Sequence, residues 1–376
     1  MPPVTVLILA PTLPDGAGHF EHVLDAARTA LAEHHRHGFL AAGASEALIR
    51  REPPDSTPFG SRLQRLVRGL SNSGPAGLVV LGAGSIPLAD ARDLAEFVAA
   101  AAADAPGALA NQRYSADAIA IARADVVLPG LPPELDSDNA LPRWLAEGAG
   151  VPVADLRRRR HLAMDVDSPL DALLLADTQV GPILPKLDAA DAGLVLGAMA
   201  ALRVVAADPG GELLLAGRVS SADLVWVERN TRSRTRAWIE ERGMRTASAG
   251  ALVGRPNRRP VRSVLGELLE REGVGALGSI VASMADGALI DSRVLMAHRF
   301  GAAERGWPAP EDRFASDLLL ANRVRDPWLA ELTASAAEAS VPVMLGAHAL
   351  VGPGVRNVLG ARRAGGGHAA GWRAGA

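Results

Sequence analysis

The sequence predicts an α/β protein built from two domains. Short apolar runs alternate with segments in which apolar residues recur at i, i+3 and i+4, as strands alternate with helices in α/β folds. The run "LVVLGA" at 78–83 is apolar throughout, which is typical of a central strand covered on both faces. With 376 residues and 48% hydrophobic content, the chain is longer than a domain with a single hydrophobic core usually is. We therefore expect a three-layer domain with a mostly parallel sheet, followed by a second α/β domain.

The first domain is expected to span residues 1–180. Its predicted strands are the apolar runs 4–10, 77–83, 107–111 and 117–122. Its predicted helices are the amphipathic segments 19–35, 59–70, 90–102 and 140–150. The opening strand has no basic region before it and prolines after it, so we do not expect a signal peptide. No later run is expected to span a membrane.

The second half restarts the α/β pattern after a connection. A segment with prolines and glycine precedes a long Ala-rich helix, so residues 181–210 are expected to be a linker and connecting helix. The second α/β domain is expected over 211–360, and the Gly- and Ala-rich segment 361–376 is expected to be a flexible tail. Its clearest predicted elements are strands at 212–217 and 341–350, a helix at 221–230, and a strand or mixed segment at 234–243.

The composition excludes several classes of function. The chain has no cysteine, which removes disulfides, thiolate metal sites and cysteine nucleophiles and makes a reducing cytoplasm the expected location. A formal net charge of -3 gives no reason to expect nucleic acid or an anionic membrane as partner. The hydrolase pattern G-x-S-x-G and the zinc pattern H-E-x-x-H are both missing. Lys186 is the only lysine, so no other position can supply a phosphate-binding lysine.

The most acidic motif is "HLAMDVDSPLDALLLA" at 161–176. Asp165 and Asp167 lie at i and i+2 at the end of a short predicted strand, so their carboxylates point the same way and suit a divalent cation. An alternative remains open, because Asp167 or Ser168 before Pro169 is also a good helix start.

The segment "ANQRYS" is polar at a predicted strand end, where α/β sheets bind ligands. Asn111, Arg113 and Ser115 could contact a base, a ribose or an acidic substrate. Arg113 is the strongest candidate, because a guanidinium pairs bidentately with phosphate or carboxylate. The alternative is a solvated hairpin turn.

The second half carries two further polar clusters. Arg218 and Ser220 follow the predicted strand 212–217 at a helix start, which suits an anion or is an ordinary cap. The stretch 290–319 gathers acids, arginines and a histidine, and either a phosphate or carboxylate site or an interdomain ion-pair network would have this pattern. Its members are Asp291, Arg293, His298, Arg299, Asp312, Arg313, Ser316 and Asp317. His348 follows the last predicted strand and either faces the same cleft or has a structural role.

Three motifs resemble a known family. Taken in order, "LVVLGAGSIPLADARDL", "NALPRWLAEGAGVPVADL" and "HLAMDVDSPLDALLL" resemble motifs of the phospholactate/phosphoenolpyruvate guanylyltransferases, and more loosely the molybdenum-cofactor guanylyltransferases. The resemblance covers roughly residues 1–180. It implies a GT-A-like nucleotidyltransferase domain. Where this family has an aspartate that helps to bind magnesium, the chain has Ser85.

The resemblance implies transfer of a nucleotidyl group, with GTP favoured, to a small phosphorylated acid with Mg²⁺ as cofactor. The alternative is an inactive nucleotide- or metabolite-binding protein on the same scaffold. Either activity is compatible with a homodimer. Asp165 and Asp167 would hold the metal, and Arg113 would join them in the catalytic group. The expected nucleotide-binding residues are Gly16, Gly18, Gly82, Gly84, Ser85, Asn111 and Ser115. The motifs "GSIPL" and "DVDSP" are expected to converge on one cleft.

Overall fold

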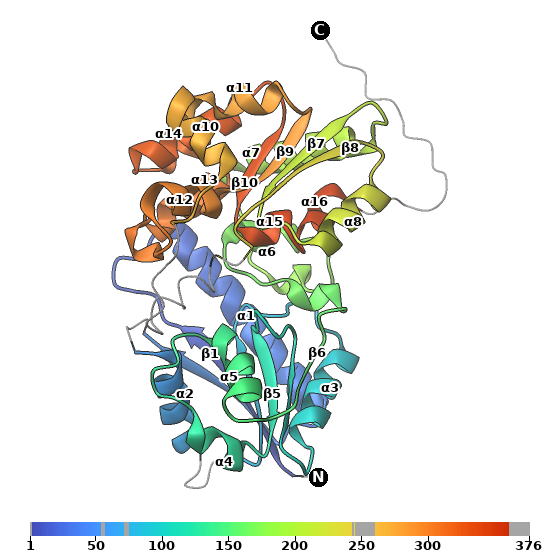
Figure 1. Ribbon diagram of the computed structural model, residues 1–376, viewed down its shortest axis with the longest axis vertical. Helices are drawn as coiled ribbons and strands as arrows, with labels where there is room; N and C mark the ends of the chain where they lie inside the picture. The colour runs from blue at the N-terminus through green and yellow to red at the C-terminus, as the bar shows by residue number, and fades with distance from the viewer. Residues whose placement is uncertain (1, 54–56, 71–74, 243, 245–259, 361–376) are drawn as a thin grey trace.

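The computed structural model describes residues 2–53, 57–70, 75–242, 244 and 260–360. Two β-sheets lie one above the other along the long axis of the molecule, each with its own helices (Figure 1). The α/β class is therefore confirmed. The predicted tail 361–376 lies outside the described residues.

The first sheet has six strands in the order β2-β1-β3-β5-β4-β6. The strands are β1 (Val4–Pro11), β2 (Glu46–Glu52), β3 (Gly77–Gly82), β4 (Gly107–Ala110), β5 (Ala118–Ala122) and β6 (Val153–Asp155). β1 pairs in parallel with β2 and β3, whereas β5 is antiparallel to both β3 and β4. The sheet is thus mixed, because the tight connection between β4 and β5 reverses the chain direction.

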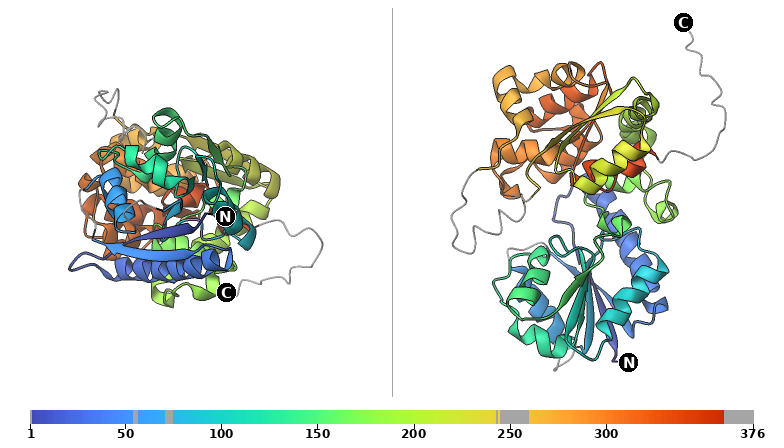
Figure 2. Two further views of the ribbon diagram at one scale, coloured as in Figure 1. Left: turned by 90° about the horizontal axis from the view of Figure 1, so that it is seen from below. Right: turned by 45° about the vertical axis from the view of Figure 1, so that its right-hand side comes forward.

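Helices cover both faces of this sheet. They are α1 (His19–Ala41), α2 (Phe59–Arg68), α3 (Ala91–Ala101), α4 (Ala124–Val127) and α5 (Leu141–Glu147). Phe39 of α1 and Phe97 of α3 belong to one hydrophobic cluster with the side chains of β1 and β3 on that face of the sheet. Leu63 of α2 and Leu141 of α5 share the cluster on the opposite face. The first half is therefore a three-layer arrangement, visible at the right of Figure 2.

The second sheet has four parallel strands in the order β10-β9-β7-β8. They are β7 (Glu212–Gly217), β8 (Arg234–Ile239), β9 (Gly287–Asp291) and β10 (Val343–Gly346). The helices that follow the first half are α6 (Pro169–Leu174), α7 (Ala189–Ala207), α8 (Ser221–Asn230), α10 (Val264–Glu272), α11 (Leu277–Ala282), α12 (Ser292–Phe300), α13 (Pro310–Asp317), α14 (Pro327–Ala337), α15 (His348–Val351) and α16 (Val355–Leu359). β7 and β9 are buried nearly throughout, as their apolar runs indicate.

Short 3₁₀ turns join several of these elements. They lie at Leu128–Gly130, Asp138–Ala140, Arg160–Ala163, Gly181–Ile183, Val274–Ala276, Glu304–Gly306 and Ala321–Arg323. The turn at Arg160–Ala163 stands where the sequence suggests a strand before Asp165.

The core of the second half continues into the first. Phe20 and Leu24 of α1 and Leu170 of α6 belong to the same cluster as the β7 and β9 side chains. α7 contacts β7, β9 and β10, so this predicted connecting helix packs on the second sheet. Among the described residues, α7 alone is long and apolar enough to cross a membrane, and 28% of its most apolar 18-residue stretch is buried in the protein.

Candidate functional site

A cavity of about 340 Å³ lies between the two halves of the chain. The carboxyl end of β1 and the first turns of α1 form one wall. The carboxyl ends of β7, β9 and β10 and the start of α13 form the other. Its lining residues are Pro11, Thr12, Leu13, Pro14, Glu21, Leu24, Asp25, Arg28, Asp167, Arg218, Arg293, Glu304, Trp307, Pro310, Arg313, Phe314, Ala347, His348 and Ala349. Ligands of α/β proteins characteristically bind at such strand ends.

Arg218 reaches the cavity from the end of β7 and is paired with Asp291 at the end of β9. Its Nε lies 2.6 Å from Oδ2 of Asp291, and its Nη2 lies 3.1 Å from Oδ1. Burial alone would raise the pKa of the Asp291 carboxyl, but the Arg218 guanidinium lowers it below its ordinary value. Gly217 permits this approach, because it has φ +118° and an added Cβ would lie 2.4 Å from the Asp291 Cβ.

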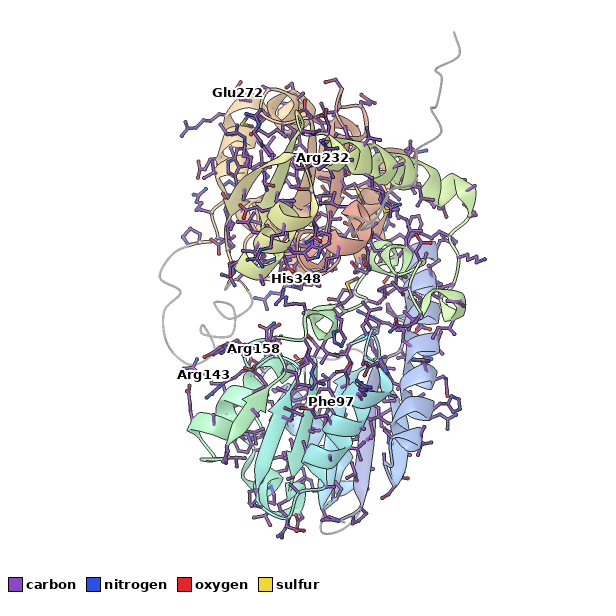
Figure 3. The ribbon with its side chains drawn as sticks, turned by 90° about the vertical axis from the view of Figure 1, so that its right-hand side faces the viewer. Phe97, Arg143, Arg158, Arg232, Glu272 and His348 are labelled. Atoms are coloured by element: carbon purple, nitrogen blue, oxygen red, sulfur yellow. The ribbon has the colours of Figure 1, made fainter. Side chains whose placement is uncertain are left out.

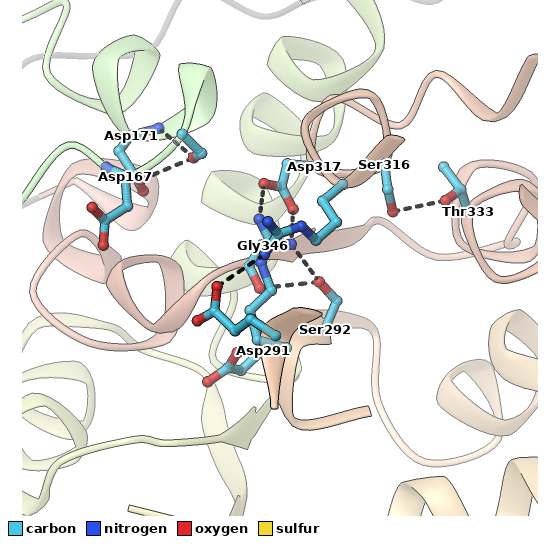
Figure 4. Close-up of polar contacts among 12 residues, drawn as sticks. Asp167, Asp171, Asp291, Ser292, Ser316, Asp317, Thr333 and Gly346 are labelled. Atoms are coloured by element: carbon cyan, nitrogen blue, oxygen red, sulfur yellow. Dashed lines mark hydrogen bonds and ion pairs between the residues drawn. The ribbon is translucent and has the colours of Figure 1, made fainter. Parts of the chain in front are cut away.

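Arg293, the first long side chain of α12, is held by a second buried pair. Its Nη1 and Nη2 each lie 2.6 Å from one carboxylate oxygen of Asp317, and Nη1 also donates to the Ser292 hydroxyl. Figure 4 shows Asp317, Ser292 and Asp291 gathered around these contacts, with the carbonyl of Gly346 accepting from Ser292. Burial raises the pKa of Asp317, and Arg293 opposes that rise. The guanidinium keeps its proton, so Arg293 brings a positive charge against the Asp317 carboxyl.

Arg313 differs from the other arginines of this wall because its pairing is incomplete. Its Nε is buried and has no hydrogen-bond partner among the described residues. Its one ion-pair contact is a long one, 3.4 Å from Nη1 to Oε2 of Glu304, although the side chain is only 15% exposed. The guanidinium lies over the Trp307 ring. Burial, followed by repulsion from Arg293, lowers its pKa from the ordinary value. Arg313 is therefore a largely buried cation with unused donors.

His348 also lines the cavity, at the start of α15 directly after β10. Figure 3 shows it at the end of the second half that faces the first, with Arg232 and Glu272 at the opposite end. It lies close enough to Asp291 to lower the pKa of that carboxyl. The arginine wall therefore carries Arg218, Arg293, Arg313 and His348.

The wall contributed by the first half is richer in acids. Asp167 pairs with Arg28 of α1 at 2.7 Å, and Arg28 Nε donates to the Val166 carbonyl. Asp25 pairs with Arg51 at 2.7 Å. The cavity thus has one wall dominated by arginine and one on which carboxylates outnumber the single arginine.

Asp171 lies in the first turn of α6, behind Asp167. Its Oδ2 accepts from the Asp167 amide at 3.0 Å and from the Ser168 hydroxyl at 2.9 Å (Figure 4). Its Oδ1 is buried without a hydrogen-bond partner among the described residues. Burial, followed by the negative charge of Asp167, raises the pKa of Asp171 to about 7. The Ser168 hydroxyl caps α6, as one of the two sequence alternatives expects.

The motifs "GSIPL" and "DVDSP" lie side by side, but they do not share the cavity, because Asp167 lines it and no residue of "GSIPL" does. Ser85 and Asp165 form an isolated antiparallel bridge, and the Val166 amide donates to the Gly84 carbonyl at 2.9 Å. An added Cβ on Gly84 would lie 2.6 Å from the Val166 carbonyl oxygen. An added Cβ on Gly82 would lie 2.8 Å from the Ser85 hydroxyl oxygen. The glycines of this turn therefore permit backbone packing against the acidic motif.

Ser85 itself is buried, and its carbonyl accepts from Nε2 of His35 at 2.8 Å. The surroundings of this position are thus those of a packed turn. Burial lowers the pKa of His35 to about 4, so the ring is neutral at pH 7.

Asp165 and Asp167, the two predicted metal ligands, are poorly suited to hold one magnesium ion together. The Arg28 guanidinium already pairs with Asp167 at 2.7 Å and supplies the positive charge that a cation would bring to this carboxylate. We therefore derive no step that depends on the metal.

Gly16 and Gly18, two of the expected nucleotide-binding residues, lead into α1. The first backbone amides of α1 donate hydrogen bonds to a carboxylate of the second half. Glu311 of α13 accepts from the Phe20 amide at 2.9 Å and from the Glu21 amide at 3.2 Å. An added Cβ on Gly18 would lie 2.3 Å from the Glu311 Cδ. The first amides of α1 are thus used to join the two halves. Gly16 is open, with no atom within 4 Å of an added Cβ.

The predicted polar strand end at Asn111 is a hairpin turn. The Asn111 side chain accepts from the Asp117 and Ala118 amides and donates to the Leu162 carbonyl. These contacts fix the connection between β4 and β5, which supports the structural alternative for Asn111. Neither Arg113 nor Ser115 lines the cavity.

Ser220 and His298 lie outside the cavity. The Ser220 hydroxyl caps α8 by accepting from the Asp223 amide, and it also accepts from Arg160. His298 belongs to α12, and its side chain is buried against α10. Its Nδ1 accepts from the Ser263 amide at 3.1 Å. Of the polar stretch 290–319, Arg293 and Arg313 share the cavity with His348, whereas His298 does not line it.

His298, Glu267 and Glu270 could place three ligand atoms around one metal ion. However, Nδ1 of His298 accepts a hydrogen bond, so Nε2 carries the proton of the neutral ring and cannot also bind a metal. Arg262 also lies 3.2 Å from Glu267. We therefore assign no metal here.

The chain matches no known protein family and no curated protein. The guanylyltransferase resemblance rests on the motifs alone. The sequence did not indicate Arg28 or Glu311, because each gains its role from a residue far away in the chain. Asp171 was also missed, although its partners Asp167 and Ser168 lie within four positions, because its role depends on burial that no local pattern reveals.

Proposed function

We propose that this protein binds a small phosphorylated molecule in the cavity between its two sheets. The observation that carries the proposal is Arg313, a largely buried guanidinium that has, among the described residues, no partner for its Nε and one long ion pair. Burying an incompletely paired cation is costly, and an anionic ligand would offset that cost. The neighbouring arginines are oriented by Asp291 and Asp317, which leaves their positions fixed before a ligand arrives.

The size and polarity of the cavity support the same proposal. A volume of 340 Å³ suits a small molecule. Phosphate carries oxygens on several sides and can accept from more than one arginine of this wall. A cytoplasmic location is part of this proposal.

Calorimetric titration with inorganic pyrophosphate tests it. Arg313→Gln is expected to weaken pyrophosphate binding by roughly 10- to 100-fold, because charge-assisted hydrogen bonds contribute about 1.5–3 kcal/mol. Arg143→Gln is the matched control, since Arg143 is an exposed residue of α5 paired only with Glu147. Malonate serves as a carboxylate probe and is expected to bind more weakly than pyrophosphate. Failure of pyrophosphate to bind at millimolar concentration would disprove the proposal, and tighter binding of malonate would disprove the phosphate assignment.

A second candidate is nucleotidyl transfer on a GT-A-like first domain. The bridge between Ser85 and Asp165 favours it, because it joins the two motifs that carry the family resemblance. The mixed sheet with β5 reversed is compatible with that scaffold. The ion pair between Arg28 and Asp167 and the Glu311 carboxylate at α1 argue against turnover. The binding function therefore has the stronger support.

Pyrophosphate release from GTP, CTP, ATP and UTP, with magnesium and a phosphorylated acid as acceptor, distinguishes the two candidates. If transfer occurs, Asp165→Asn is expected to reduce the rate at least tenfold, since a carboxylate oxygen is a preferred Mg²⁺ ligand and an amide is a weaker one. Asp177→Asn, at an exposed position of the same region, should leave the rate unchanged. No release from any of the four nucleotides would eliminate this candidate without affecting the binding proposal.

A further inference from the structure

The outer face of α7 is apolar and unusually exposed for a helix that packs on a core. Leu194 is 53% exposed, Leu196 is 40% exposed and Val204 is 70% exposed. The helix has two charged side chains, and both contact other parts of the same chain. Asp191 pairs with Arg323 at 2.7 Å, and Arg203 donates to the carbonyls of the α16 segment. No charged side chain of α7 is therefore left for its outer face.

Two glycines make a shallow notch on this face. Gly193 and Gly197 are exposed, and an added Cβ at either would have no atom within 4 Å. Glycines four residues apart lie on one side of a helix and allow a second helix backbone to approach closely. A glycine within a helix is otherwise unfavourable by about 1 kcal/mol relative to alanine. A partner helix that uses the notch would offset this cost.

We infer that the partner is α7 of a second copy of this chain, in an antiparallel arrangement about a twofold axis. In such a pair, Val204 of each copy lies opposite Gly193 of the other, so the most exposed side chain fills the notch. The same arrangement brings exposed Lys186, before one helix, toward exposed Asp208, after the other. The face is thus complementary to itself in shape and charge.

The area of this face sets the strength of the dimer. A 19-residue helix is about 28 Å long and about 10 Å wide, so two faces bury roughly 600 Å² in total. Stable interfaces bury about 1,200–2,000 Å². The dimer is therefore weak and depends on concentration. Sedimentation equilibrium should show an average mass that rises from 38.9 kDa toward twice that value as concentration increases. Gly197→Leu should keep the mass at one chain at every concentration.

Disulfide trapping tests the register, since the natural chain has no cysteine. Mixing a Gly193→Cys protein with a Val204→Cys protein under mild oxidation should give a crosslinked heterodimer as the main product. A Leu40→Cys protein, altered at an exposed site of α1, should not crosslink with either. A wild-type mass that stays at one chain up to about 500 µM would overturn the inference. Retention of the dimer by Gly197→Leu would overturn it too. So would binding of a single chain to phospholipid vesicles through this face.

Discussion

Asp317→Ala is expected to lower the free energy of unfolding by about 3–5 kcal/mol, which is the usual cost of removing one member of a buried ion pair. Arg293 is almost fully buried, and both of its terminal nitrogens contact the two oxygens of Asp317 at 2.6 Å. The substitution leaves the guanidinium buried without that bidentate partner. Urea unfolding followed by circular dichroism measures the difference.

The matched control is Glu147→Ala, which removes an exposed partner of Arg143 on α5. This i,i+4 surface pair should contribute only about 0.3–0.5 kcal/mol. The double variant Arg293→Met with Asp317→Leu should recover part of the lost stability, because no charge is then buried alone. If Asp317→Ala costs no more than the control, the pair does not stabilise the second half.

Much of the fold could be predicted from the sequence, because several of its strands are continuous apolar runs. The runs at 4–10, 77–83 and 212–217 became β1, β3 and β7, and the helix at 221–230 matches α8. β2 was missed because "EALIRRE" contains few apolar residues, and its pairing with β1 supplies what its composition lacks. The reversal of β5 is the hairpin that the sequence left open at 111–115, and the sequence alone could not decide it, since direction within a sheet depends on which strands pair.

The candidate site was predictable where it follows strand ends and at Arg313, which lies on α13 within the predicted polar stretch 290–319. Arg218, Asp291, Arg293 and His348 all follow strands of the second sheet, and three of them line the cavity. Asp291 lies behind that lining and orients Arg218. The sequence could not reveal that Asp167 pairs with Arg28, a contact across 139 positions of the chain. Long-range ion pairs of this kind depend on how α1 and α6 pack, and no local pattern encodes that packing.

The second large effect concerns Asp171 and pH. In the folded protein its pKa is raised to about 7, first by burial and then by the charge of Asp167, whereas the ordinary value is 3.8. Between these values the folded state keeps a proton that the unfolded state has lost. The contribution of Asp171 to stability is therefore complete below about pH 4 and is lost as pH rises through 7.

Asp171→Asn is expected to remove this loss, because the amide oxygen can still accept from the Asp167 amide and the Ser168 hydroxyl while the group stays neutral. The shift from 3.8 to about 7 corresponds to roughly 4 kcal/mol. The stability difference between variant and wild type should therefore grow by up to about this amount in favour of the variant from pH 4 to 8. His35, whose burial gives the opposite pH dependence, is common to both proteins and cancels in the difference. Asp177→Asn, at an exposed position, should follow the wild type at every pH. Urea unfolding at pH 5, 6, 7 and 8 measures the difference, and parallel curves for Asp171→Asn and wild type would show that Asp171 is ionised in the folded protein throughout.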